Sequence, residues 1–138
     1  MRRVFVDTSA FVALRNRAER EHEQARRALR QLMGERVALF TSNYVFAEAY
    51  TALLVRLGRH EAVTWGERFR AGRSIELVRV DEDLEEHAWS LLVSHPDKAW
   101  SYVDATSFVL MERERTDEAL ALDRNFVQRG LRLHPPPV

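Results

Sequence analysis

The chain of 138 residues contains no cysteine and a single lysine, Lys98, and its formal net charge at pH 7 is zero. Without cysteine it has no disulfide bond, no thiolate zinc site and no thiol nucleophile. No apolar run approaches the roughly 18 residues that a membrane-spanning helix requires. Charge returns at Arg15, too early for the apolar core of a signal peptide. We therefore expect a cytoplasmic protein that does not enter a membrane.

The composition is that of one folded domain. Apolar residues make up 46% of the chain and charged residues 30%, which is typical of a folded protein rather than a disordered one. No internal repeat, low-complexity block or linker divides the chain. We expect a single domain over residues 1–138, long enough to bury an apolar core.

Short apolar runs alternate with longer segments that carry helix-start and helix-stop signals. The predicted strands are residues 4–6, 37–40, 75–80 and 119–122, with an edge strand at 131–133. The predicted helices are residues 10–14, 21–33, 41–57, 60–71, 81–94 and 101–115, with a helical turn after residue 123. This alternation predicts an α/β fold with a mainly parallel central sheet and helices on both faces.

Two of the predicted strands end directly on an aspartate. Asp7 follows the strand at 4–6, and Asp123 follows the strand at 119–122. Because the carboxyl ends of parallel strands lie on one edge of a sheet, where ligands bind, we expect both carboxylates on the same rim. Aspartate is also a favoured helix N-cap, so capping is a second interpretation of each residue.

Two further acids interrupt helices that are otherwise apolar. The helix around Glu48 is apolar nearly all round, so we expect it to be largely buried. A buried carboxylate is costly unless it is paired or binds a metal, and the alternative for Glu48 is a salt bridge to an arginine. Asp104 lies in a similar helix. If Ser101 is the N-cap, Asp104 stands at the third helical position, where a carboxylate favours the helix dipole.

Together, these four acids favour a metal site. Four carboxylates on one rim repel one another and raise their own pKa values unless something relieves the repulsion. A hard divalent cation does so, and ligands that are all oxygen select Mg²⁺ or Mn²⁺ over zinc. The sequence therefore predicts a site for Mg²⁺, with Mn²⁺ as a substitute.

The segments that carry the acids resemble the PIN domain, in particular the VapC-type toxin ribonucleases of toxin–antitoxin pairs. The segments are Asp7-Thr8-Ser9 after a strand, "FAEA" around Glu48, "DKAWSYVDATSFVLM" around Asp104, and "ALDRNF" around Asp123. The third segment is the most specific, and the ordered set covers essentially the whole chain. The resemblance implies a PIN-like three-layer sandwich.

The resemblance also implies roles for individual residues. The family's acidic quartet, which binds metal and carries catalysis, corresponds to Asp7, Glu48, Asp104 and Asp123. Ser9 corresponds to the hydroxyl beside the first acid. Thr106 is a candidate for a hydroxyl that contacts a metal-binding acid and not the metal itself. Asn125 stands where many relatives carry histidine, so little is expected of it.

By this resemblance the protein is a metal-dependent endoribonuclease and the toxin of a VapBC-type pair. Attack by a metal-activated water does not use the RNA 2′-hydroxyl, so products with 5′-phosphate and 3′-hydroxyl ends are expected. The family also implies a VapB-type antitoxin that blocks the site, and a homodimer.

Other residues are open to more than one interpretation. Arg15 and Arg124 lie near the acids in sequence and are candidates for holding RNA phosphates, although solvated or ion-paired roles are also open. The apolar stretch at residues 45–57 is either core, which we favour, or part of a dimer interface. The tryptophans are expected to pack in the core rather than to stack on bases: Trp65, Trp89 and Trp100.

Three alternative functions are considered. A housekeeping PIN nuclease in RNA processing would carry the same acids, but the small size favours the toxin. A non-catalytic binding module would use the acids only as helix caps. Phosphatases and phosphotransfer receivers of similar fold agree poorly with the sequence. A haloacid-dehalogenase-type phosphatase requires aspartate where Ser9 stands, and a receiver requires a lysine after a late strand, whereas Lys98 precedes a helix.

Overall fold

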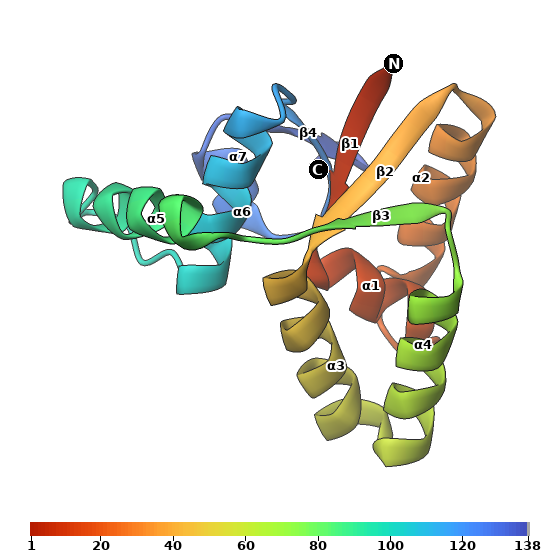
Figure 1. Ribbon diagram of the computed structural model, residues 1–138. Helices are drawn as coiled ribbons and strands as arrows, with labels where there is room; N and C mark the ends of the chain where they lie inside the picture. The colour runs from red at the N-terminus through yellow and green to blue at the C-terminus, as the bar shows by residue number, and fades with distance from the viewer. Residues whose placement is uncertain (138) are drawn as a thin grey trace.

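The computed structural model describes residues 1–137, in which seven helices flank a five-stranded sheet (Figure 1). The strands are β1 (Arg2–Val6), β2 (Val37–Ser42), β3 (Ile75–Val78), β4 (Glu118–Leu120) and β5 (Arg132–His134). The helices are α1 (Thr8–Arg15), α2 (His22–Gly34), α3 (Asn43–Leu57), α4 (Arg59–Ala71), α5 (Glu82–Ser94), α6 (Tyr102–Arg113) and α7 (Arg124–Gln128). All strand pairs are parallel, in the order β3-β2-β1-β4-β5.

The strand order places helices on both faces of the sheet. From β1 the chain builds outward through β2 to β3, then crosses back to β4 on the other side of β1 and ends at β5. Because parallel crossovers are right-handed, this reversal puts α5–α7 on the opposite face from α1–α4, as Figure 1 shows. The predicted α/β sandwich is confirmed, and its sheet is parallel throughout.

β1 lies at the centre of the sheet, and its residues Val4, Phe5 and Val6 are completely buried. Phe5 pairs with Phe40 of β2 on one side and with Ala119 of β4 on the other. A strand enclosed by helices on both faces and by strands on both edges has no exposed side, which explains its unbroken apolar run. The strand order reverses between β1 and β4, where open α/β sheets form a ligand-binding crevice beyond their carboxyl ends.

Aromatic side chains fill the layers between sheet and helices. On one face, Trp65 of α4 stands edge-on to Phe11 of α1, with ring centroids 5.4 Å apart. On the other face, Phe126 of α7 stands edge-on to Phe108 of α6 at 5.0 Å. This geometry is favoured by the ring quadrupoles. The predicted burial of Trp65 and Trp100 is confirmed, because only 9% and 7% of their surfaces are exposed.

Two predictions about burial are wrong. α3 is not buried all round, because its fully buried residues form one stripe at four-residue spacing, Val45, Ala49 and Leu53. On its outer side Val55 is 79% exposed, so the apolar stretch is only partly core. Trp89 is 58% exposed on the outer side of α5 and does not pack in the core.

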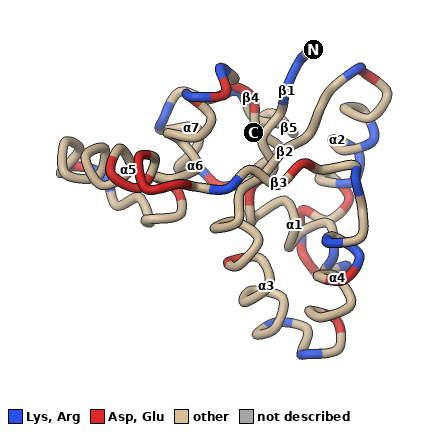
Figure 2. The backbone as a smooth tube through the Cα atoms, viewed as in Figure 1, with Lys and Arg blue, Asp and Glu red and all other residues tan. Residues whose placement is uncertain are grey.

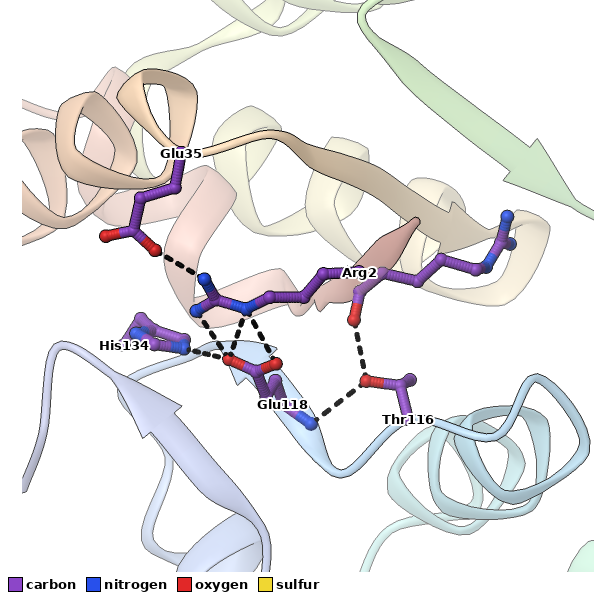
Figure 3. Close-up of polar contacts among 6 residues, drawn as sticks. Arg2, Glu35, Thr116, Glu118 and His134 are labelled. Atoms are coloured by element: carbon purple, nitrogen blue, oxygen red, sulfur yellow. Dashed lines mark hydrogen bonds and ion pairs between the residues drawn. The ribbon is translucent and has the colours of Figure 1, made fainter.

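An ion-pair network joins β1, β4 and β5 (Figure 3). The guanidinium of Arg2 donates to both carboxylate oxygens of Glu118, with Nη2 2.7 Å from Oε1, and also pairs with Glu35. His134 Nε2 lies 2.8 Å from the same Oε1. Hydrogen bonds from Arg2 lower the pKa of Glu118 to about 2, and the His134 contact adds to the effect. The network therefore ties the first strand to the last two.

Charged residues lie along the chain on both sides of the sheet (Figure 2), and no helix within residues 1–137 is long and apolar enough to cross a membrane. Acidic residues gather at the start of α5, where Asp81 caps the helix by accepting a hydrogen bond from the backbone N of Leu84. Negative charge at this end complements the helix dipole. The observed helix therefore begins where the sequence predicts it.

Candidate functional site

A hollow of about 320 Å³ lies beyond the carboxyl ends of β1 and β4, where the strand order reverses. All four predicted acids line it: Asp7 after β1, Glu48 on α3, Asp104 on α6 and Asp123 before α7. The fold thus gathers carboxylates that are far apart in the sequence. The position is the crevice that the strand order creates.

Asp7 caps α1 and is buried, with 3% of its surface exposed. Its Oδ2 accepts hydrogen bonds from the backbone N of Ser9 at 3.2 Å and from Ser9 Oγ at 2.7 Å. Burial raises the pKa of this carboxyl to about 7 against the lowering effect of the Ser9 bonds, and the charge of Asp104 adds to the rise. No basic residue within residues 1–137 forms an ion pair with Asp7. A buried carboxylate of this kind favours binding of a cation.

Asp104 is held by a capping box at the start of α6. Its backbone N donates to Ser101 Oγ at 3.0 Å, and its Oδ2 accepts from the Ser101 backbone N at 3.2 Å. The same Oδ2 accepts a hydrogen bond from Asn125 Nδ2 at 2.8 Å. Burial raises the pKa of Asp104, the Asn125 bond lowers it, and the charge of Asp123 raises it further. Asp7, Asp104 and Asp123 are therefore electrostatic neighbours.

Ser9 connects the two strand ends at the site. Its Oγ donates to Asp7 Oδ2 and accepts a hydrogen bond from the backbone N of Leu122 at 2.9 Å. Leu122 precedes Asp123, which caps α7 by accepting from the backbone N of Asn125 at 2.9 Å. Ser9 therefore orients the first acid and also fixes the turn that carries the fourth.

Glu48 is half-buried on α3 and lines the hollow from that helix. Its expected deep burial is wrong, because it stands outside the single buried stripe of α3. The alternative of a salt bridge to an arginine is not found within the described residues 1–137. Glu48 also lines a shallow groove with Tyr44 and Thr51. Its carboxylate is therefore available to a ligand.

Helix capping and ligand binding are compatible at this site. Asp7, Asp104 and Asp123 all accept hydrogen bonds from backbone N–H groups at helix starts, as the capping interpretation predicts. In Asp7 and Asp104 these bonds converge on one oxygen, and Asp123 accepts its bond through one oxygen, so each carboxylate has a second oxygen for another ligand. Thr8 Oγ1 also belongs to the lining; it is buried without a hydrogen-bond partner among residues 1–137. A group that the polypeptide does not supply would satisfy it.

The donors suit a hard divalent cation. The lining offers carboxylate and hydroxyl oxygens and no histidine, which is the donor set of Mg²⁺ and Mn²⁺. In the part of the chain that the structure describes, no three acidic or histidine side chains are gathered closely enough to enclose an ion. Mg²⁺ keeps several waters and is usually held by one or two carboxylates, so an open set of acids fits it.

Three other predicted residues do not line the acidic hollow. Thr106 is buried, and its Oγ1 donates to the Val103 carbonyl oxygen at 2.7 Å. Arg15 at the end of α1 pairs with Glu61, with 2.7 Å between Nη2 and Oε2. Arg124 is exposed at the start of α7 and lines a neighbouring groove. The predicted roles of these residues remain predictions.

Two features of the site do not follow from the sequence patterns. The low expectation for Asn125 is wrong, because its amide donates to Asp104 and positions that carboxylate. Its closeness to Asp123 in sequence is the one signal of this role. Arg56 of α3 also lines the hollow, where it pairs with Glu19 at 2.7 Å between Nη1 and Oε1.

A parallel α/β sandwich with these acids at its switch point is what the PIN domain provides, and the family model of the PIN domain matches residues 4–130. Because this match covers most of the sequence, the chain belongs to the PIN-domain family. The family predicted from the sequence motifs is confirmed.

Within this family, the chain is similar to the 23S rRNA-specific endonuclease VapC20 of Mycobacterium tuberculosis. The two are 36% identical over 127 residues, which is 92% of this chain and 94% of VapC20 from strains CDC 1551 and H37Rv. The crystal structure of M. tuberculosis VapC20, described as a sarcin-ricin loop cleaving toxin, matches with a TM-score of 0.84 over 93% of this chain and 95% of that one. The predicted fold and the predicted nuclease class are thereby confirmed.

Proposed function

We propose that this protein is an endoribonuclease that hydrolyses RNA with a divalent metal ion, and that it is the toxin of a VapBC-type pair. The metal-binding and catalytic residues we propose are Asp7, Glu48, Asp104 and Asp123. The observation that carries the proposal is the buried Asp7 carboxylate at the switch point, beside Asp104 and without a cationic partner in residues 1–137. Similarity to an endonuclease over 92% of the chain supports this class of reaction.

When bound, Mg²⁺ or Mn²⁺ would supply positive charge to an RNA phosphate and lower the pKa of a coordinated water. The contribution of the protein is to hold the acids in fixed orientations. Ser9 fixes Asp7, while Ser101 and Asn125 fix Asp104 through hydrogen bonds to a single oxygen. Because these two carboxylates are buried, water screens their charges poorly, which strengthens their attraction for a cation.

The reaction we propose adds one water molecule across a P–O bond of the RNA backbone. The water oxygen bonds to phosphorus and the 3′ oxygen leaves, so the products carry 5′-phosphate and 3′-hydroxyl ends. The ribose 2′-hydroxyl is not consumed, and the chain contains no cysteine that could act as a nucleophile. Analysis of the product ends distinguishes this route from cleavage through a 2′,3′-cyclic phosphate.

The substrate we propose is structured RNA. VapC20 is described as specific for 23S rRNA and as cleaving the sarcin-ricin loop, so ribosomal RNA is the first substrate to test.

A VapB-type antitoxin that covers the hollow, a homodimer and a cytoplasmic location complete the proposal. A housekeeping nuclease of RNA processing would share the site chemistry but would have no antitoxin. Co-purification with the product of a neighbouring gene separates these two roles.

A non-catalytic binding module is the competing function, because Asp7 and Asp123 cap helices and Asp104 belongs to the capping box of α6. Capping does not account for Glu48, which lies within α3 rather than at its start. It also does not require a carboxylate as deeply buried as Asp7, since the capping Asp81 of α5 is exposed.

The test is RNA cleavage by the purified protein with and without Mg²⁺ or Mn²⁺. We expect metal-dependent cleavage by the wild type and a loss of about a hundredfold or more in Asp7→Asn and Asp104→Asn, the order reported for removing one electrostatic group from an active site. Asp81→Asn is the matched control, because it changes a capping aspartate outside the hollow and should keep full activity. Unchanged cleavage by both site variants would rule out the proposed metal site.

A further inference from the structure

A second hollow, of about 610 Å³, opens beside the acidic one. Arg20, from the turn before α2, and Arg124, at the start of α7, both line it, together with the proline segment 135–137 after β5. The two hollows share Glu21 and Leu122 in their linings, so they adjoin along the same side of the protein. We call this second hollow the Arg20–Arg124 groove.

The Arg20–Arg124 groove contains the two arginines near the acids that form no ion pair within residues 1–137. Three basic side chains line the two hollows: Arg20, Arg56 and Arg124. Arg56 is engaged by Glu19. Arg20 and Arg124 form no ion pair within residues 1–137, and both are exposed. Arg124 directly follows Asp123, so α7 fixes its position relative to the acids.

A polyanionic substrate requires such charge. The acidic hollow repels RNA phosphates except one that a bound cation neutralises, so the neighbouring phosphates must be held by basic residues. The planar guanidinium of arginine contacts phosphate oxygens through two parallel hydrogen bonds. Val127, which is 41% exposed, and the prolines add apolar surface on which a ribose or an unstacked base can pack.

We propose that the Arg20–Arg124 groove holds the RNA strand next to the scissile phosphate, with each arginine contacting one backbone phosphate. This inference rests on the proposed ribonuclease function and adds the path of the substrate. Contacts to phosphates are independent of base sequence, so the groove positions the strand and does not select it. Arg20 and Arg124 are positioning residues and do not take part in the chemical step.

The experiment measures binding of a short fluorescein-labelled single-stranded RNA of mixed sequence by fluorescence anisotropy over a series of KCl concentrations. The Asp104→Asn background keeps the RNA intact. Each arginine that contacts a phosphate should contribute about 0.7 to the slope of log affinity against log salt. The double variant Arg20→Gln/Arg124→Gln should therefore bind with a slope about 1.4 smaller than its parent. Arg70→Gln, at an exposed α4 position outside both hollows, is the matched control and should keep the parental slope.

Two further measurements separate positioning from folding and from the chemical step. Arg124→Lys keeps the charge, so it should retain most of the slope that Arg124→Gln loses. In cleavage assays with intact Asp104, the double variant should raise KM about tenfold or more, in keeping with the loss of charge-assisted contacts, while kcat changes little.

A parental salt slope in the double variant would overturn the proposal and leave the groove to another occupant, such as a protein segment. A slope that falls by about 0.7 in Arg70→Gln would overturn it as well, because the effect per removed charge would then be one of net charge. Failure of the wild type to cleave RNA would refute the proposed function, whereas the binding slope judges the groove alone.

Discussion

Replacement of Asp7 by asparagine should make the metal-free protein more stable while it removes metal binding. The Asp7 carboxylate is buried at the end of β1, and burial raises its pKa from 3.8 to about 7. Asparagine keeps the capping oxygen that accepts from the Ser9 backbone N, since it is an equally good N-cap. The substitution therefore removes the buried charge and leaves the start of α1 in place.

The magnitude follows from the pKa. A carboxyl that binds its proton more tightly in the folded state makes the protein lose stability as pH rises from about 4 to 7, with no further loss above that range. The rise to about 7 corresponds to about 4 kcal/mol at pH 8. Both Ser9 hydrogen bonds go to Oδ2, and a neutral amide oxygen at that position accepts them more weakly than a carboxylate does, which costs about 1 kcal/mol. Asp7→Asn should thus gain about 3 kcal/mol, or about 10 °C in Tm for a chain of this size.

Thermal unfolding followed by circular dichroism in EDTA, at pH 5 and at pH 8, provides the assay. The stabilisation by Asp7→Asn should be large at pH 8 and small at pH 5, where the wild-type carboxyl is protonated in the folded state. Addition of Mn²⁺ should raise the Tm of the wild type by mass action and that of the variant much less. A variant that is less stable than the wild type at pH 8 in EDTA would refute the reasoning, because Asp7 would then act as a cap without a costly charge.

Three further predictions concern other residues. Asp104→Asn should retain the circular dichroism spectrum of the wild type, because asparagine can still accept from Ser101, yet RNA cleavage should fall about a hundredfold or more; normal activity would exclude Asp104 from the site. Glu118→Gln should lower the free energy of unfolding in urea by about 2 kcal/mol, since it breaks the charged hydrogen bonds to Arg2. This difference should disappear as pH falls from 4.5 toward 2, where the wild-type carboxylate takes up a proton; a constant difference would argue against the ion pair. Arg15→Ala should leave RNA affinity within about twofold, because Glu61 already occupies its guanidinium in a partly exposed pair, and a tenfold loss would show that Arg15 contacts RNA.

The fold could be predicted from the sequence because its strands are short apolar runs that stop abruptly. Val4, Phe5 and Val6 are completely buried, and the first charged residue after this apolar run is Asp7. The same contrast located Asp123 after β4. For Asp7, Asp104 and Asp123, the sequence could not decide between helix capping and ligand binding, because the two roles are compatible. Each carboxylate accepts a backbone hydrogen bond at a helix start through one oxygen, and its second oxygen can bind a ligand.

Other features depend on contacts that no local pattern reveals. The apolar outer side of α3, with Val55, resembles its buried stripe in composition, so counting apolar residues overestimates the burial of the helix. Trp89 is exposed although tryptophan is usually well buried. Asn125 supports Asp104 across 21 residues of sequence, and that contact exists because α6 and α7 lie on the same face of the sheet.

A crystal structure of the protein soaked with Mn²⁺, with the ion located by its anomalous scattering, tests the central claim most directly. We expect a peak in the acidic hollow, at about 2.2 Å from carboxylate oxygens of Asp7 and Asp104 and completed by waters, with Asp123 and Glu48 on the same ion or its waters. The Asp7→Asn variant should show no peak there. An empty hollow in crystals of a protein that cleaves RNA with Mn²⁺, or an ion bound only at other acids such as Asp81, would contradict the account.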